Sequence, residues 1–201
     1  MPAAVKHAKL LDLVHWIDQN IGGLVLPCDE RSQLAIGCLD VALEHQAAIA
    51  LLYYSELYGS MHAMLRVLSD AVVRGVWLHQ CATEADLARF KNGHIPPFGE
   101  LVRQYEEKLG TPDGVLSGFK MSAWASLCDF THTGFLQVIR RHSPGRLGAN
   151  YPDRELAAVL GAAGALGLLA ACTLVAIARR DDLGPSLAEK VTAFVRPEPW
   201  D

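Results

Sequence analysis

The sequence has no excess of basic residues. Its 201 residues include 18 lysines and arginines against 22 aspartates and glutamates, which gives a formal net charge of −4. Proteins that bind nucleic acid mainly through phosphate contacts usually carry a surplus of positive charge. The charge balance therefore disfavours that class, and we expect no DNA partner, although a local basic patch would still allow RNA to bind.

The sequence also lacks paired cysteines. The chain has five widely scattered cysteines, and no two of them have C-x-x-C spacing: Cys28, Cys38, Cys81, Cys128 and Cys172. This spacing excludes a zinc knuckle and a thioredoxin-type motif. Free thiols are typical of a reducing compartment, and the N-terminus has no basic-then-apolar signal sequence. The sequence therefore predicts a cytoplasmic protein.

Sequence motifs of the common enzyme classes are missing as well. The chain has no P-loop, no G-x-G-x-x-G after a strand, no H-E-x-x-H and no nucleophile elbow. Asp129 and His132 have the three-residue spacing of a metal-binding helix element, but a di-metal bundle needs two such elements and further carboxylates. We therefore expect no metal and no cofactor.

Helical periodicity dominates what is present. Hydrophobic residues make up 51% of the chain and charged residues 20%, and no stretch shows period-2 alternation or a hairpin turn. The pattern predicts an all-α bundle of about seven to nine helices in a single domain over residues 1–201. The helices over 5–19 and 185–195 are expected at its periphery. Helix N-caps or capping boxes are predicted at Asp29, Ser60, Thr83 with Asp86, Asp153, and Ser186 with Glu189.

One predicted helix is apolar throughout. Residues 156–178 contain no charged residue over 23 positions, which is long enough to span a bilayer. More than half of these residues are Ala or Gly, which insert weakly into membranes but allow neighbouring helices to pack closely. The composition favours a central helix buried on all sides of the bundle over a membrane span.

A ladder of charged residues follows one face of the third long helix. His62, Arg66, Asp70 and Arg74 are spaced four apart, so Asp70 is able to pair with both arginines. Because apolar residues surround the ladder, we expect it to be partly buried. Such a ladder either forms structural ion pairs or lines a functional site, and both interpretations remain open.

Arg74 and His79 end the same helix with the spacing Arg, four residues, His. This spacing resembles the Rx4-6H motif of the HEPN superfamily of all-helical prokaryotic proteins. The resemblance implies a metal-independent ribonuclease of a toxin–antitoxin or phage-defence system. His79 would move the proton of the RNA 2′-OH, and Arg74 would stabilise charge on the phosphate. The family usually places a polar residue directly after the Arg, whereas this chain has Gly75.

A wider resemblance covers roughly residues 30–180. The run from Ala50 to Ala82 is similar to helical proteins related to abortive-infection HEPN proteins, which also have a Ser/Asp-x2-His element, here Asp129 to His132. Carried over, the resemblance implies a homodimer with a site across its two-fold axis. It also implies an RNA substrate or a protein antitoxin as partner. Arg66 and Asp70 would support this site, and His132 would face it across the cleft.

Arg140 and Arg141 belong to a small basic cluster that also contains His142 and Arg146. The cluster either complements the dipole at a helix C-terminus or binds a phosphate. Two other functions remain open beside the HEPN-like ribonuclease. One is a non-catalytic helical module for interaction or oligomerisation, and the other is a protein anchored in a membrane through residues 156–178.

Overall fold

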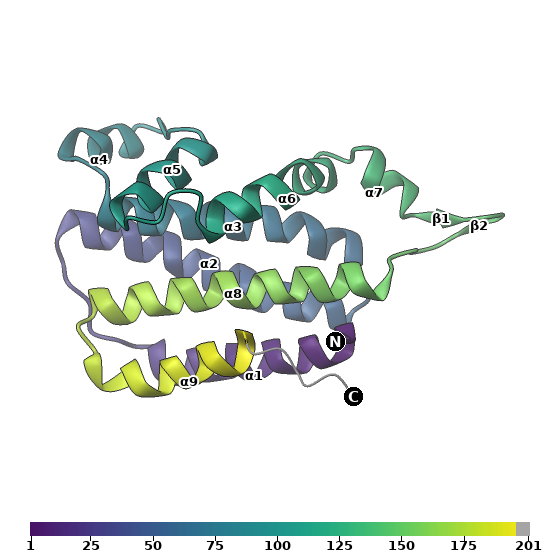
Figure 1. Ribbon diagram of the computed structural model, residues 1–201, viewed down its shortest axis with the longest axis horizontal. Helices are drawn as coiled ribbons and strands as arrows, with labels where there is room; N and C mark the ends of the chain where they lie inside the picture. The colour runs from purple at the N-terminus through teal and green to yellow at the C-terminus, as the bar shows by residue number, and fades with distance from the viewer. Residues whose placement is uncertain (196–201) are drawn as a thin grey trace.

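The structure is a computed structural model that describes residues 1–195. Within these residues the chain forms nine α-helices, one short 3-10 helix and one β-hairpin whose two strands have two residues each (Figure 1). The predicted all-α fold is confirmed. The elements are α1 (Ala3–Ile21), α2 (Glu30–Tyr54), α3 (Tyr58–Gln80), α4 (Glu84–Lys91), α5 (Phe98–Lys108), α6 (Val115–Thr131), α7 (Phe135–Ile139), β1 (His142–Ser143), β2 (Arg146–Leu147), α8 (Asp153–Ile177), η1 (Asp181–Leu183) and α9 (Gly184–Val195).

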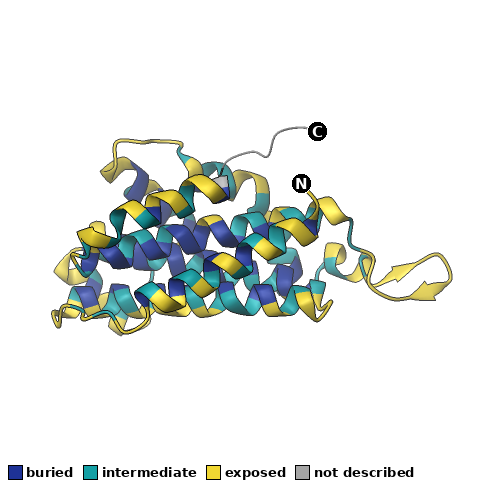
Figure 2. Ribbon diagram, turned by 90° about the horizontal axis from the view of Figure 1, so that it is seen from below, coloured by how far each residue is buried: buried dark blue, intermediate teal, exposed yellow. Residues whose placement is uncertain are grey.

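The four longest helices, α1, α2, α3 and α8, form the centre of the bundle. The apolar helix α8 packs against α1, α2, α3 and α9, which confirms the prediction of a central apolar helix. Its fully buried residues include Leu160, Ala163, Ala170 and Ala171. In Figure 2 the buried residues concentrate between these helices, while the outer helices are mostly exposed. Small residues let α8 pack closely against several neighbours, and this close packing produces the core.

Two helices, α2 and α8, are long and apolar enough to cross a membrane. The most apolar 18-residue stretch of α8 is 67% buried by other parts of the protein, against 33% for that of α2. A core helix of a bundle has the same composition as a membrane span because both exchange water for an apolar environment on every side. Most of this stretch of α8 is buried by the protein's own chain, which is the arrangement expected of a core helix.

The predicted caps at Asp29 and Thr83 are confirmed. The Asp29 carboxylate accepts a hydrogen bond from the backbone N–H of Ser32 at 3.0 Å. Thr83 and Asp86 form a reciprocal capping box at the start of α4. Both caps depend only on residues three apart in the sequence, so a sequence pattern is sufficient to predict them.

The predicted caps at Ser60 and Asp153 are wrong. Helix α3 already begins at Tyr58, because the chain reverses at Glu56, which has a positive φ of 57°. Asp153 lies inside the first turn of α8, where its carboxylate accepts hydrogen bonds of 3.1 and 3.2 Å from the backbone N–H of Ala3. Asp153 therefore caps α1, a helix 150 residues away in sequence.

The capping box predicted at Ser186 is wrong as well. The last helix begins at Gly184, so Ser186 lies in its first turn and donates to the carbonyl of Leu183 at 3.1 Å. The first helix, predicted at the periphery, buries Leu10 and Leu13 against the bundle and belongs to its core. The strands β1 and β2, which no alternation pattern predicted, pair around Pro144–Gly145.

Candidate functional site

The charged ladder of α3 leads towards α5 and α6. Arg66 forms an ion pair with Asp70, and the guanidinium lies 3.5 Å from the centre of the Trp124 ring of α6. Trp124 in turn stacks on Phe98 of α5, with ring centres 3.9 Å apart. Arg74 is the second, more distant partner of Asp70, at 3.9 Å. The middle of the ladder therefore consists of ion pairs within α3, and the contact of Arg66 with the Trp124 ring links α3 to α6.

At the other end of the ladder, His62 lines a pocket of about 540 Å³ between α3, α6 and α8. Most of the lining is apolar, with Leu65, Leu127 and Val159 as examples. Polar groups enter from three elements, with His62 on α3, Ser126 on α6 and Glu155 on α8. A concave, mainly apolar cavity with a few convergent polar groups is the usual form of a small-molecule site.

His62 is a buried imidazole with one ring nitrogen in use. Its Nδ1 lies 2.7 Å from the carbonyl oxygen of Tyr58, which is only an acceptor, so Nδ1 carries the hydrogen. The ring packs against Phe130 and Tyr151 with centre distances of 4.5 and 5.1 Å. Burial lowers the pKa of His62, so the imidazole is neutral at pH 7. Its Nε2 then carries a lone pair that is able to accept a hydrogen bond, and no group in residues 1–195 donates to it.

Arg140 and Glu155 form an ion pair on the wall of the same pocket. The Nε of Arg140 donates to Glu155 Oε2 at 3.1 Å, and Nη2 donates to Oε1. Both side chains are less than a third exposed, which strengthens the pair relative to one in open solvent. Within the described part of the chain, Arg140 Nη1 has no hydrogen-bond partner. The pair therefore holds Arg140 in place and leaves donors available.

The comparisons with known proteins identify a family. A family model described as a family of unknown function, DUF6988, matches residues 39–196. The chain belongs to the DUF6988 family. No curated protein and no solved structure matches it. The match covers every residue that lines the pocket between α3, α6 and α8, so this pocket lies within the DUF6988 region.

The DUF6988 chain does not bring Arg74 and His79 to one pocket. His79 lines a separate pocket with Asp29 and Arg179, from which Arg74 is absent. Burial lowers the pKa of His79, and its Nδ1 is a buried atom without a hydrogen-bond partner. Arg74 instead contacts Asp70. Residues five apart on a helix diverge by about 140°, which explains why a single copy of the chain separates the two side chains.

The other predicted residues lie at the far end of α6. His132 is exposed at the C-terminal end of that helix. Asp129 accepts a hydrogen bond from the backbone N–H of Leu136, so its carboxylate caps α7. Arg141, next to Arg140 in the sequence, lines a different pocket, together with Gln137 and Val138. Residues 1–195 contain no group of three or more His, Cys, Asp or Glu side chains placed to hold a metal.

Sequence reasoning missed Glu155 and Ser126 as pocket residues. Glu155 stands in the first turn of an apolar helix, where an acidic residue ordinarily complements the helix dipole. Ser126 stands in a helix with no charge pattern around it. The local sequence around Glu155 or Ser126 does not indicate that either residue lies near Arg140 or His62. The pocket joins segments that are far apart in the sequence.

Proposed function

We propose that this protein is a non-catalytic helical binding module whose pocket between α3, α6 and α8 takes a small molecule with an apolar body and one anionic group. The observation that carries the proposal is the unpaired Nη1 of Arg140 beside a mainly apolar cavity. An anionic group would accept hydrogen bonds from this nitrogen, and its attraction to the guanidinium is stronger than in water because the side chain is partly buried. The neutral His62 supplies an acceptor for a hydroxyl or amide group of the same ligand.

The fluorescent dye 8-anilinonaphthalene-1-sulfonate tests this site because it combines an aromatic body with a sulfonate. We expect saturable binding to the folded protein, and Arg140→Gln should raise the Kd about tenfold, which corresponds to about 1.4 kcal/mol. Glu155→Gln should leave the affinity for the dye unchanged or raise it, because the Arg140 guanidinium is then released from its ion pair with Glu155. Fluorescence titration measures both values, with melting curves to exclude binding to unfolded protein.

A pair of alanine variants provides the steric control. Ala158 on α8 is exposed and lines the pocket mouth, whereas Ala125 on α6 is exposed outside the pocket. Ala158→Trp should abolish dye binding and Ala125→Trp should not change it. Equal binding by both tryptophan variants, or an unchanged Kd in Arg140→Gln, would remove the proposal.

A metal-independent ribonuclease is the second candidate, and the placement of His62 and Arg140 on one pocket favours these two residues over the Arg74–His79 pair that the HEPN resemblance implies. In this reaction Nε2 of His62 takes the proton of the RNA 2′-OH, and the oxygen attacks the neighbouring phosphorus. The bond to the 5′-oxygen breaks, that oxygen takes a proton from water, and a 2′,3′-cyclic phosphate remains. Arg140 would stabilise the negative charge that develops on the phosphate.

RNA cleavage in the presence of EDTA tests the second candidate and assigns its residues. If the activity exists, His62→Gln and Arg140→Lys should each lower the rate at least a hundredfold, while His79→Ala and Arg74→Ala retain it. The reverse pattern would assign the reaction to the Arg74–His79 pair, which would then require a second copy of the chain. If the native protein does not cleave RNA, the ribonuclease candidate is rejected and the binding module is the remaining proposal.

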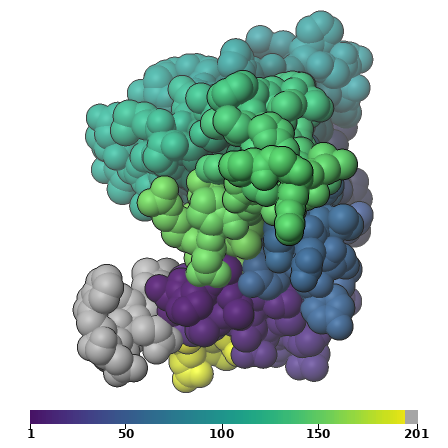
Figure 3. All heavy atoms as spheres, turned by 90° about the vertical axis from the view of Figure 1, so that its right-hand side faces the viewer, coloured from purple at the N-terminus to yellow at the C-terminus, as the bar shows by residue number. Residues whose placement is uncertain are grey.

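The predicted homodimer, the antitoxin partner, the role in defence and the cytoplasmic location stay predictions. A homodimer is supported by exposed apolar residues at one end of the molecule, where α7 and the hairpin extend beyond the bundle (Figure 1). Figure 3 views the molecule from this end. Phe135 is 72% exposed there and Leu147 is 89% exposed. Contact with a second copy would remove these side chains from water.

A further inference from the structure

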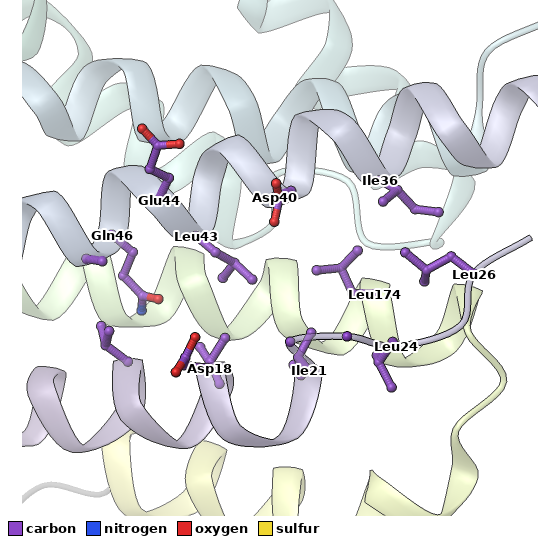
Figure 4. A pocket seen from close by; sticks show the side chains of 15 residues that line it. Asp18, Ile21, Leu24, Leu26, Ile36, Asp40, Leu43, Glu44, Gln46 and Leu174 are labelled. Carbon is purple, nitrogen blue, oxygen red and sulfur yellow. The ribbon is translucent and has the colours of Figure 1, made fainter.

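A second pocket lies between α1, α2 and α8, outside the site described above. It has a volume of about 370 Å³ and a largely apolar lining that includes Ile21, Leu43 and Leu174 (Figure 4). The lining contains three carboxylates and no Lys, Arg or His side chain. The carboxylates and the apolar side chains together define the chemistry of a suitable ligand.

The three carboxylates are Asp18 on α1 and Asp40 and Glu44 on α2. In Figure 4, Asp18 on α1 and Asp40 on α2 lie on either side of the pocket, whereas the Glu44 carboxylate projects from α2 away from α1. Asp40 and Glu44 are four residues apart on one helix, a spacing at which like charges repel. None of the three forms an ion pair with the described part of the chain. A bound cation would be attracted by this local negative charge.

Gln46 is the independent sign of a ligand, because a buried amide lines the same pocket. Its side chain is only 1% exposed, and its Nε2 donates to the carbonyl oxygen of Ala163 at 3.3 Å. That bond fixes the orientation of the amide and leaves Oε1 as an acceptor, for which residues 1–195 supply no donor. In Figure 4 this oxygen is directed towards the cavity. Gln46 Oε1 is not one of the fully buried unpartnered atoms of residues 1–195, so it reaches the cavity, where a bound molecule can donate to it in place of water.

Gly167 of α8 makes room for this amide. A Cβ at position 167 would lie 2.0 Å from Nε2 of Gln46 and 2.5 Å from its Oε1. Any side chain at position 167 would displace the amide from its place between α2 and α8. The acceptor is thus held rigidly in the lining of the pocket, while Asp18 and Asp40 lie on either side of the pocket.

We propose that this pocket binds a linear polyamine, with one nitrogen donating to Gln46 Oε1, the methylene chain against the apolar lining, and a terminal ammonium between Asp18 and Asp40. The methylene groups match the aliphatic side chains, and the positive charge matches the three carboxylates. A divalent metal ion fits less well, because the acidic side chains do not converge as a ligand set. The site is separate from the proposed anion pocket, so the two proposals fail or succeed independently.

Calorimetric titration of the full chain with spermidine tests the polyamine site. We expect saturable binding that Asp18→Asn with Asp40→Asn weakens at least tenfold and that Gln46→Met weakens severalfold. The control is Asp12→Asn with Glu189→Gln, which changes the net charge equally at exposed positions outside the pocket. This control should bind within about twofold of the native affinity, since charges beyond about 10 Å are largely screened at 0.1 M salt.

Three outcomes would overturn the assignment. Equal weakening in both double variants would show diffuse charge attraction in place of a site. Displacement of spermidine by Mg²⁺ at equal concentration would also show diffuse charge attraction in place of a specific site. Tighter binding of N-acetyl-lysinamide than of spermidine would reassign the pocket to a lysine side chain of another protein. Melting curves of each variant, which should match that of the native protein, separate loss of the site from loss of the fold.

Discussion

Glu106→Ala is expected to lower the free energy of unfolding by about 3 kcal/mol. Glu106 is a buried carboxylate on α5, 4% exposed, that caps the first turn of α6. It accepts hydrogen bonds from the backbone N–H groups of Gly114, Leu116 and Ser117 at 3.2, 2.9 and 3.1 Å, and from the Ser117 hydroxyl at 2.5 Å. Alanine would leave these donors without their partner and release α6, which forms one wall of the anion pocket.

The same carboxylate should make stability depend on pH. Burial by itself raises the pKa of Glu106, but the hydrogen bonds from Ser117, Leu116 and Gly114 outweigh it and hold the pKa below its ordinary value. A lowered pKa contributes stability that is present above the unfolded-state value of about 4.3 and is lost as the pH falls through the folded-state pKa. The advantage of the native protein over Glu106→Gln should therefore shrink below about pH 5.

Urea unfolding at pH 7 and pH 4 measures both effects, and the adjacent residue provides the control. Glu107 is 54% exposed and forms an ion pair with Arg103 at 2.7 Å. Glu107→Ala should cost less than about 1 kcal/mol, as is usual for surface ion pairs. A similar loss in both alanine variants would show that the capping bonds of Glu106 contribute little.

Gly75→Ala is expected to destabilise the protein by about 2 kcal/mol, the opposite of its usual effect inside a helix. A Cβ at this position would lie 2.6 Å from Leu39 Cγ and 3.2 Å from the carbonyl oxygen of Ala35. Because both atoms belong to α2, the added methyl group must push α3 away from α2. The helical gain of alanine over glycine, about 1 kcal/mol, is too small to offset that separation.

Gly37→Ala is the matched control for Gly75→Ala. Gly37 is an exposed glycine in α2, and a Cβ there would meet nothing within 4 Å. The substitution should stabilise the protein by about 0.5–1 kcal/mol. Thermal and urea unfolding of both variants compare the signs directly. A stabilising Gly75→Ala would show that α2 and α3 do not require this close approach.

The same contact gives a reason for the glycine after Arg74, where HEPN proteins usually have a polar residue. Position 75 faces α2 at a distance that admits only a hydrogen atom. The close packing of α3 on α2 therefore explains why position 75 is a glycine. Whether Arg74 has a catalytic role is decided by the cleavage experiment and not by this departure.

The sequence determined the features that depend on neighbouring residues. Helical periodicity predicted the long helices, and the caps at Asp29 and Thr83 followed from residues three apart. The composition of residues 156–178 indicated a central helix buried on all sides; α8 is central and packs against α1, α2, α3 and α9, but Ala158, Ala165 and Ala176 remain exposed. These predictions succeed because hydrophobic period and capping act over one or two helical turns.

Only the tertiary structure decided which charged groups meet. Arg74 and His79 are near in sequence but lie on different flanks of α3, whereas His62, Arg140 and Glu155 come from distant segments to one pocket. Asp153 caps α1, and Gln46 lies against Gly167, through contacts between helices that are far apart in sequence. The direction of a side chain around its helix follows from local geometry, but the helix that it faces depends on how the whole bundle packs.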